Sequence, residues 1–493
     1  MTEVILAIGG FLDVGPFKLI ATAARASARA GVGHSRKARL KVKTTRDTSS
    51  LRLARLMTLA VASTPTRAVH ASSTGSRRHR ARAMTRATPI APFEFQTATR
   101  MVFGRDAFAR VPSLVAELAT LEGVDATNNP IFVVTGASDR FSAPLEAMFR
   151  REIPGVEVVT FHCPKGEPTT ASAEEAIRAA VNARCGVVVA VGGGTAVDTA
   201  KCVAAMLTNG GESPDLYDFL EVVGRAQPLT RRTAPFVAIP TTAGPGAEVA
   251  KNSVLEAGDR KVSMRHPFML PSVAVIDPVL TLSLPRDATA HTGLDALTQC
   301  IEPYVCCMPN PMVDAISMAG IVAGAGALRR VVDDGSDIDA REQMCLCSYY
   351  GGVSLANAKL GAVHGFSGTL GGLLHAPHGA ICAALLPHSW TINIAALEGR
   401  VSRDDPESAK RVLARYAEVA RALTGKPDAT ARDGVEHIVE LVKHCDVPGL
   451  GSFGLKESDF PSVIEKSKQS SSMKGNPVAL TDEELGDMLR LAL

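Results

Sequence analysis

The chain has 493 residues, 46% of them hydrophobic, which is enough to bury large cores and to build about two domains. Its net charge of +3 hides a division: residues 1–90 carry 17 Lys or Arg and 3 acids, whereas residues 91–493 carry 36 and 47. No run reaches the roughly 18 uninterrupted apolar residues of a membrane span, so no membrane association is expected.

The first ninety residues are rich in Ala, Arg, Ser and Thr and contain no acid between Thr48 and Ile90. Clustered Arg can neutralise nucleic-acid phosphates, but this segment lacks interleaved aromatic residues and precedes an acidic chain of globular composition. We therefore interpret residues 1–92 as a disordered leader, a transit peptide for a chloroplast or mitochondrion. Met57 is an alternative start, because the sequence after it makes a better transit peptide than the sequence before it.

The ten cysteines include a CC and a CLC pair but no CxxC pair, and most lie in apolar helical contexts. We expect them to be small buried side chains in a reducing compartment. Neither a thiolate zinc site nor a disulfide scaffold is indicated.

From Phe93 onward, short β-rich runs alternate with amphipathic helical segments. Strands are expected at 131–135, 156–161, 187–191, near 236 and near 273. Continuous Val and Ile runs between amphipathic helices are typical of a parallel sheet covered on both faces. After about Leu284 the periodicity is helical and no convincing strand follows. The sequence thus predicts an α/β domain with a parallel sheet over 93–283 and an all-α domain over 284–493.

Two glycine-rich loops follow expected strands. In VVVAVGGGTAVDTAK, residues 187–201, the glycines allow a close backbone approach to an anion, and the helix start offers free N–H groups. The motif is neither a Walker A loop nor GxGxxG, and alone it is equally consistent with a tight turn. IPTTAGPGAEV, residues 239–249, also follows a strand at a carboxyl edge, where doubly wound sheets bind ligands. Together the two loops favour a dinucleotide site.

The stretch GAVHGFSGTLGGLLHAPHG, residues 361–379, is almost free of charge and contains three histidines. A single histidine in an apolar run is more often a core or loop residue than a metal ligand. The stretch alone therefore leaves its function open.

Six motifs in this order resemble the iron-containing alcohol dehydrogenase family: GGGTAVDTAK, IPTTAGPGAEV, IDPVLTLSLP, HTGLDALTQCIEPYV, GAVHGFSGTLGGLLHAPHGAICAALLPH and NPVALTDEEL. The resemblance runs from about Phe93 to the C-terminus, and the superfamily includes glycerol dehydrogenases and maleylacetate reductases. It implies an α/β nucleotide-binding domain, a helical metal-binding domain and an active site in the cleft between them. The implied activity is hydride transfer between NAD(H) or NADP(H) and a small alcohol, aldehyde or oxo-acid, in a homo-oligomer with no nucleic-acid partner.

The resemblance also implies that Asp295, His364 and His378 bind Fe2+ or Zn2+ and act in catalysis through that ion. Position 299 is Gln where typical members have His, and an amide oxygen is a poorer ligand than imidazole for such ions. Gln299 is therefore expected to line the site rather than to complete it. One carboxylate and two imidazoles are still the minimum of an open catalytic site.

Two further positions of this stretch depart from the ligand pattern. Position 368 is Gly where many members of the family have another histidine, and His375 lies outside the pattern and is expected to be a loop residue. The glycines between His364 and His378 are expected to let the chain fold back, so that both rings reach one ion.

The resemblance assigns the cofactor mainly to the two loops and a lysine. The implied residues are Gly192, Gly193, Gly194, Thr195, Asp198, Thr241, Thr242 and Lys261. The alternative for Lys261 is an ordinary surface lysine. In NAD-preferring members, the strand that corresponds to IFVVT, residues 131–135, is followed by an Asp. In this chain the sequence IFVVTGASDR has Gly136 at that position. Because Ser138 and Arg140 are near enough to bond a 2′-phosphate, NADP(H) is favoured over NAD(H). Alternatively, Asp139 makes the ribose contact instead.

Three other functions remain open at this point. One is a maleylacetate reductase-like enzyme without a metal. Another is a dehydroquinate synthase-like lyase, which shares the fold, NAD and an acid-His-His site but needs basic residues that the segment 287–310 lacks. The third, suggested by Gln299 alone, is a catalytically silent binding protein.

Overall fold

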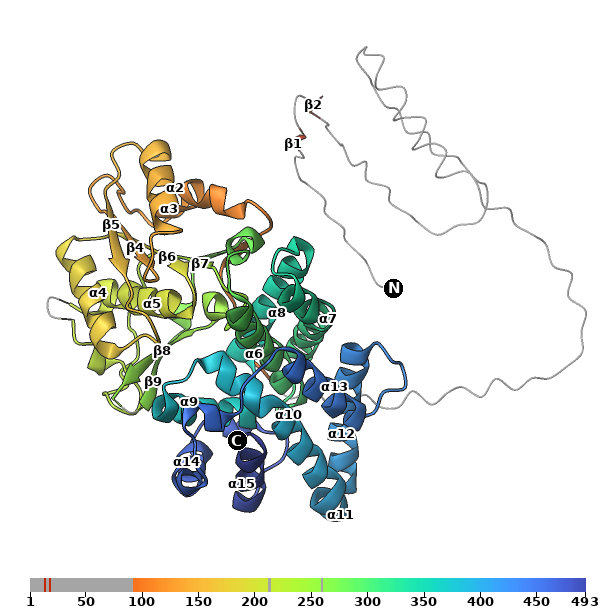
Figure 1. The fold of residues 1–493 in the computed structure, drawn as a ribbon. Helices are drawn as coiled ribbons and strands as arrows, with labels where there is room; N and C mark the ends of the chain where they lie inside the picture. The colour runs from red at the N-terminus through yellow and green to blue at the C-terminus, as the bar shows by residue number, and fades with distance from the viewer. Residues whose placement is uncertain (1–12, 15–16, 19–91, 212–213, 259) are drawn as a thin grey trace, which may run out of the picture. The chain divides into compact units, whose positions relative to one another are not determined.

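The computed structural model describes residues 13–14, 17–18, 92–211, 214–258 and 260–493. Residues 1–86 and 87–493 form two separate compact units. In the first, β1 (Asp13–Val14) and β2 (Phe17–Lys18) pair antiparallel (Figure 1). The expected leader, residues 1–92, otherwise lies outside the described residues, so its interpretation stays a prediction.

The second unit contains a six-stranded parallel sheet. In spatial order its strands are β3 (Arg100–Phe103), β10 (Val273–Ile276), β7 (Phe236–Pro240), β6 (Val187–Gly192), β4 (Ile131–Thr135) and β5 (Val158–His162). Five of these strands were predicted from their Val- and Ile-rich runs. β3 was not predicted from the sequence. It is a four-residue edge strand with two exposed positions, so its hydrophobic pattern is weak.

Helices cover both faces of this sheet, as predicted (Figure 1). They are α2 (Val111–Leu121), α3 (Ser142–Glu152), α4 (Thr170–Asn182) and α5 (Gly194–Asn209). Alternate strand residues serve the two faces: Ile131 and Val133 of β4 pack in the cluster that includes α2 and α3, whereas Phe132 and Val134 pack in the cluster with α4 and α5. Every β4 residue is buried, which explains its uninterrupted apolar sequence.

An antiparallel hairpin, β8 (Asn252–Ala257) and β9 (Arg260–Arg265), lies beside the sheet and was not predicted. Buried and less buried residues alternate along both strands, and Gly258 adopts a left-handed φ of 65° between them. Period-two alternation around a short glycine-containing turn is the hairpin signal that the sequence analysis overlooked. The hairpin matters because β9 packs against α9 (Ala362–Leu374) in the helical region.

Residues 284–493 contain helices and no strand, as predicted. In addition to α9, the α-helices are α6 (Arg286–Val305), α7 (Pro311–Asp333), α8 (Ile338–Asn357), α10 (His378–Ala396), α11 (Ser402–Asp404), α12 (Pro406–Thr424), α13 (Ala431–His444), α14 (Phe460–Lys468) and α15 (Asp482–Leu491). α7 and the segment His378–Asp404 are long and apolar enough to span a membrane by composition alone. The apolar window of the second is 78% buried within the protein, as in a core helix.

The sheet ends at Ile276 and the helical region begins with α6 at Arg286. Contacts nevertheless group residues 87–493 into one compact unit. The domain boundary expected near residue 283 therefore stays a prediction.

Candidate metal centre and cofactor cleft

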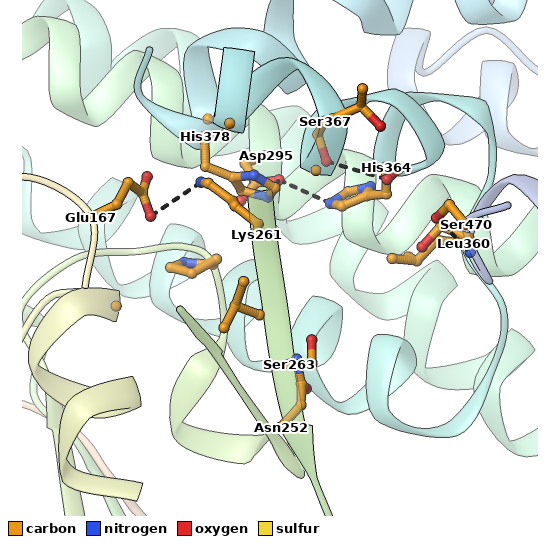
Figure 2. A pocket seen from close by; sticks show the side chains of 18 of the residues that line it. Glu167, Asn252, Lys261, Ser263, Asp295, Leu360, His364, Ser367, His378 and Ser470 are labelled. Carbon is orange, nitrogen blue, oxygen red and sulfur yellow. Dashed lines mark hydrogen bonds and ion pairs between the residues drawn. The ribbon is translucent and has the colours of Figure 1, made fainter. Parts of the chain in front are cut away.

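One large cavity, with a volume of about 1330 Å³, connects the sheet to the helical region. Its lining includes Gly194 and Thr242 from the two glycine-rich loops. Lys261 from β9, and Asp295 and His378 from the helices, also line it (Figure 2). The cavity therefore brings together residues that lie far apart in the sequence but were predicted to serve one active site.

The first glycine-rich loop connects β6 directly to α5. Gly192 ends the strand, Gly193 is the N-cap and Gly194 begins the helix. A Cβ atom at Gly192 would lie 2.7 Å from Ala196 Cβ, and one at Gly194 would lie 3.3 Å from the Pro245 ring. Gly192 thus permits the tight turn from β6 into α5, and Gly194 lets the second loop approach closely. No side chain caps α5, so its first N–H groups remain suited to a phosphate.

The polar residues of these loops are held by local hydrogen bonds. Thr195 Oγ1 donates to Gly166 O at 2.9 Å, and Thr242 Oγ1 donates to Gly244 O at 2.6 Å. Thr241 donates its N–H to Gly192 O at 3.0 Å, which joins the second loop to the first. Thr195 and Thr242 line the cavity and Thr241 does not. Their contacts with a cofactor stay predictions.

Asp198 lines the cavity but already has protein partners. It accepts hydrogen bonds from Lys201 Nζ at 3.2 Å and from the backbone N–H of Val254 at 3.1 Å. The bond from Val254 ties α5 to the β8–β9 hairpin, whereas the bond from Lys201 lies within α5. The structure thus shows a structural role for Asp198, and its predicted cofactor contact remains untested.

Lys261 points into the cavity, and its side chain is only 6% exposed. Its Nζ lies 3.2 Å from Glu167 Oε2 (Figure 2). Gly371 of α9 makes room for it, because a Cβ atom there would lie 2.8 Å from Lys261 Cε. The alternative that Lys261 is merely a surface lysine is therefore wrong.

Gly136 and Ser138 follow the carboxyl end of β4 and do not line the cavity. Gly136 O lies 3.3 Å from His162 Nδ1, and Asp139 Oδ1 lies 3.2 Å from His162 Nε2. The three predicted metal ligands, by contrast, are brought together at the helical end of the cavity.

Asp295 lies on α6, His364 in the first turn of α9, and His378 at the start of α10. His364 Nε2 is 3.3 Å from Asp295 Oδ1, and His378 Nε2 is 3.9 Å from the same oxygen. Asp295 is 2% exposed, and its Oδ1 has no hydrogen-bond partner among the described residues. A buried carboxylate oxygen without a partner is costly, so this atom fits a metal ion.

The chain reverses direction between His364 and His378 at a different place from the one expected. The glycines lie inside α9, which continues to Leu374, and the turn is formed by His375 with a left-handed φ of 48°. Gly365 instead allows close packing, because a Cβ atom there would lie 2.9 Å from Met473 Cβ. His375 is indeed outside the cluster, and its side chain is 67% exposed.

Gln299 is buried one helical turn after Asp295, so it lines the site as predicted. Its Nε2 donates to Asp295 Oδ2 at 3.3 Å, while its Oε1 has no hydrogen-bond partner among the described residues. The amide thus fixes one carboxylate oxygen and leaves the other directed at the histidines.

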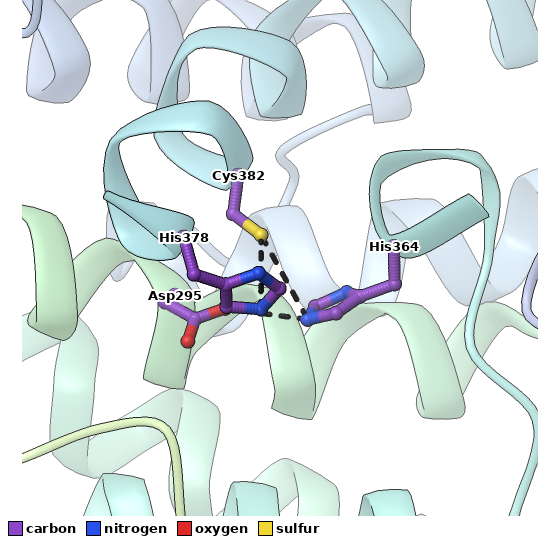
Figure 3. A group of neighbouring side chains, drawn as sticks. All are labelled: Asp295, His364, His378 and Cys382. Atoms are coloured by element: carbon purple, nitrogen blue, oxygen red, sulfur yellow. Dashed lines mark hydrogen bonds and ion pairs between the residues drawn. The ribbon is translucent and has the colours of Figure 1, made fainter. Parts of the chain in front are cut away.

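Two functional residues were missed by the sequence analysis. Glu302 accepts from His364 Nδ1 at 2.7 Å and from the backbone N–H of Val363 at 2.8 Å, which leaves His364 Nε2 facing the cluster. Cys382 lies one turn after His378 on α10 and contributes the fourth potential ligand atom, all four lying within 4.8 Å of one another (Figure 3). The signals were Glu302 at i+7 from Asp295 and Cys382 at i+4 from His378.

The expectation that the cysteines are small buried side chains is therefore confirmed at all but one position. Nine of the ten thiols are buried, Cys307 is exposed, and all are free. Cys382, however, is adjacent to both histidines of the cluster. The absence of a CxxC pair did not exclude this arrangement, because its partners come from other helices.

The side chains of the cluster shift one another's proton affinity. Burial opposes ionisation of Asp295, but the nearby His378 and His364 hold the pKa of this carboxyl below its usual value. Burial also disfavours protonated His364 and His378, yet Cys382 and Asp295 raise the pKa of both rings. Against burial, the two rings lower the pKa of Cys382. The carboxyl and the thiol of the cluster thus favour their anionic forms beside a positive charge. A bound divalent ion supplies such a charge.

A glycine-rich loop before an uncapped helix and a buried carboxylate–imidazole cluster in one cavity are typical of metal-assisted, nicotinamide-dependent dehydrogenases. Comparison with known families agrees: residues 98–278 match the model of the iron-containing alcohol dehydrogenases, and residues 289–493 match their C-terminal domain. The chain belongs to the iron-containing alcohol dehydrogenase family.

Individual relatives support this assignment. The chain is 34% identical to 4-hydroxybutyrate dehydrogenase of Cupriavidus necator, with 69% of this chain and 86% of the relative covered. It is 32% identical to 1,3-propanediol dehydrogenase of Citrobacter freundii, with coverages of 69% and 84%. Among solved structures, a 1,3-propanediol oxidoreductase superposes with a TM-score of 0.71 at 28% identity, covering 82% of this chain and all of the other.

The protein is therefore an oxidoreductase that acts on the CH–OH group of alcohols, or on aldehydes in the reverse direction, with a nicotinamide cofactor. The family implies NAD(H), an iron-type metal and a small-molecule alcohol substrate. Of the alternatives, neither a lyase nor a silent binding protein is supported by these relatives.

Proposed function

We propose that this enzyme interconverts small alcohols and aldehydes or oxo-acids with a divalent metal ion and with NADP(H) as its working cofactor. The observation that carries the proposal is Asp295 Oδ1, a buried oxygen that faces two imidazole rings and has no hydrogen-bond partner among the described residues, in the same cavity as the β6–α5 loop. A maleylacetate reductase-like enzyme without metal has no need of such a cluster.

The chain's own residues position the reaction. The β6–α5 loop would hold the cofactor phosphates at the uncapped start of α5, in the cavity that Asp295, His364 and His378 also line. Glu302 fixes the ring of His364, and Gln299 fixes the carboxylate of Asp295. Bound at Asp295, His364 and His378, a divalent ion supplies Lewis-acid stabilisation of negative charge on the substrate oxygen, worth several kcal/mol.

The test is a spectrophotometric assay of purified enzyme against a panel of short-chain aldehydes, oxo-acids and their alcohols, with each cofactor. We expect oxidation of the reduced cofactor with at least one aldehyde or oxo-acid. If no member of the panel is turned over by correctly folded, metal-replete protein, the proposal is wrong.

NADP(H) is proposed because the position after β4 is Gly136, which carries no charge to repel a 2′-phosphate. Asp139, the alternative ribose contact, is near His162 and has a 75% exposed side chain. A Cβ atom at Gly136 would meet nothing within 4 Å, so Gly136→Asp introduces the charge without a clash. We expect kcat/KM to favour NADPH in the wild type and to shift toward NADH in G136D. A wild type that favours NADH, or an unchanged preference in G136D, contradicts this proposal.

Residues 1–92 are proposed to direct the protein to a chloroplast or mitochondrion. The support is compositional: this segment is basic and poor in acids, unlike the rest of the chain. Import into isolated organelles should remove a segment that ends between residues 57 and 95. A stable mature protein that retains residues 1–50 would contradict the proposal.

A homo-oligomer is also proposed. α7 exposes apolar side chains at Met312 (45% exposed) and Val322 (57% exposed), which a second copy would cover. Light scattering at micromolar concentration should give a mass that is a multiple of the chain's mass, and a monomer would contradict this.

A further inference from the structure

Cys382 is placed as a metal ligand would be. It lies on α10 one turn after His378, is fully buried, and directs its Sγ toward both imidazole rings (Figure 3). Sγ is 3.7 Å from His378 Nε2 and 3.9 Å from His364 Nε2. Each of these ring nitrogens also faces Asp295 Oδ1. Four atoms from three helices therefore surround one point.

The separations match those expected around a single zinc ion. With Zn–S near 2.3 Å and Zn–N near 2.05 Å, a tetrahedral site places sulfur and nitrogen about 3.6 Å apart and nitrogen and oxygen about 3.4 Å apart. The observed S–N distances are 3.7 and 3.9 Å, and the N–O distances are 3.3 and 3.9 Å. Small side-chain movements are enough to close this geometry.

Gln299 at position 299 leaves the place of a fourth protein ligand to another side chain. Gln299 Nε2 donates a hydrogen bond to Asp295 Oδ2, so the amide does not take the place of the metal-binding imidazole that typical members have at this position. Thiolate is a softer ligand than carboxylate or imidazole and therefore favours zinc. A site made of carboxylate and imidazole alone suits iron(II) as well as it suits zinc.

We propose that Cys382 is the fourth protein ligand of this enzyme, and that its thiolate shifts the preference of the site from Fe2+ toward Zn2+. The thiol releases its proton to solvent as the ion binds. Zinc can expand to five ligands, so four protein ligands still permit a substrate oxygen on the side open to the cavity. This inference rests on the metal site of the proposed function.

The test is X-ray absorption at the zinc edge of the purified full-length enzyme, together with its metal content. We expect about one zinc per chain, with one sulfur near 2.3 Å and nitrogen or oxygen neighbours near 2.0–2.1 Å. Only nitrogen and oxygen neighbours around a stoichiometric metal would overturn this inference and leave the proposed function standing. Metal-free protein with full activity would instead refute the metal site itself.

Variants provide a second readout. C382S should lose the sulfur neighbour and lower the ratio of bound zinc to iron when both ions are offered anaerobically. C445S, which removes another buried thiol at the end of α13, should leave both unchanged. The double variant C382S/Q299H should regain metal with nitrogen and oxygen neighbours only. An unchanged zinc-to-iron ratio in C382S would contradict the proposal, and if C382S does not fold, the wild-type spectrum decides.

Discussion

Hydrogen bonds from Gln299 to Asp295 and from His364 to Glu302 fix the orientation of two of the predicted metal ligands. Asp295, His364 and His378 were identifiable from the sequence because the family motif extends over their whole surroundings. Glu302 was not, because its i+7 spacing from Asp295 places it on one face of α6 but does not reveal that it bonds His364, 62 residues further along the chain. Cys382 was missed for a related reason: its neighbours in the cluster lie on α6 and α9 as well as on its own helix.

Replacing Glu302 by Gln should weaken metal binding by about 10- to 100-fold, the range typical of such supporting partners. The amide keeps the size of the side chain and can still accept from Val363, but it no longer provides the charge that supports His364. Chelator competition on purified protein measures the effect. Glu418→Gln is the matched control. Glu418 accepts a hydrogen bond from Tyr304, which is also on α6, but Glu418 is not part of the metal-ligand cluster. Equal metal affinities in both variants would show that Glu302 does not act on the site.

Glu248, near the end of the second glycine-rich loop, predicts a pH dependence of stability. Burial raises its pKa to about 7. Between its unfolded pKa near 4.5 and 7, the folded state holds more protons, so this residue lowers stability as the pH rises through that window. Glu248→Gln should therefore be more stable than wild type at pH 8, by on the order of 2 kcal/mol, and the gap should shrink toward pH 5.

Thermal unfolding at pH 5, 6.5 and 8 measures this difference. The exposed Glu122→Gln serves as the control and should show the same curve as the wild type. A pH-independent difference between Glu248→Gln and the wild type would contradict burial as the cause.

At the scale of elements, the predicted strands and helices of the sheet were largely correct because fully buried parallel strands have uninterrupted apolar sequences. The β8–β9 hairpin and the α9–α10 turn were not obtained. The hairpin's alternation is short, and non-glycine residues adopt the left-handed conformation of His375 too rarely for the sequence to place a turn there. These elements place Lys261 and His378, so the sequence predicted the ligands better than their arrangement.

The contact between α10 and α6 should be sensitive to a single methyl group. A Cβ atom at Gly379 would lie 2.6 Å from the backbone oxygen of His291. Gly379→Ala must therefore displace the first turn of α10, which carries His378, and should cost about 1–3 kcal/mol of stability. Weaker metal retention should accompany this loss.

Gly368→Ala is the matched control, because a Cβ atom at that position of α9 meets nothing within 4 Å. Differential scanning calorimetry and metal analysis of both variants measure the difference. The close approach of α10 to α6 would be unimportant if Gly379→Ala retained the melting temperature and metal content of Gly368→Ala.

For the whole molecule, the order of motifs predicted a nucleotide-binding sheet followed by metal-binding helices, and the structure places both in one cavity. What the sequence could not provide is the shape of that cavity, since its lining comes from both glycine-rich loops, the hairpin and four or more helices. Substrate choice depends on this shape. The chemistry depends on the metal cluster, whose residues are specified by type and spacing.

The most direct test of the account measures metal content and turnover on the same sample of purified enzyme during stepwise removal of metal by a chelator. We predict that turnover falls in proportion to the bound metal and returns when Zn2+ or Fe2+ is restored, and that folded His364→Ala protein holds no metal and shows no turnover. Full turnover by protein that contains no metal would contradict the account.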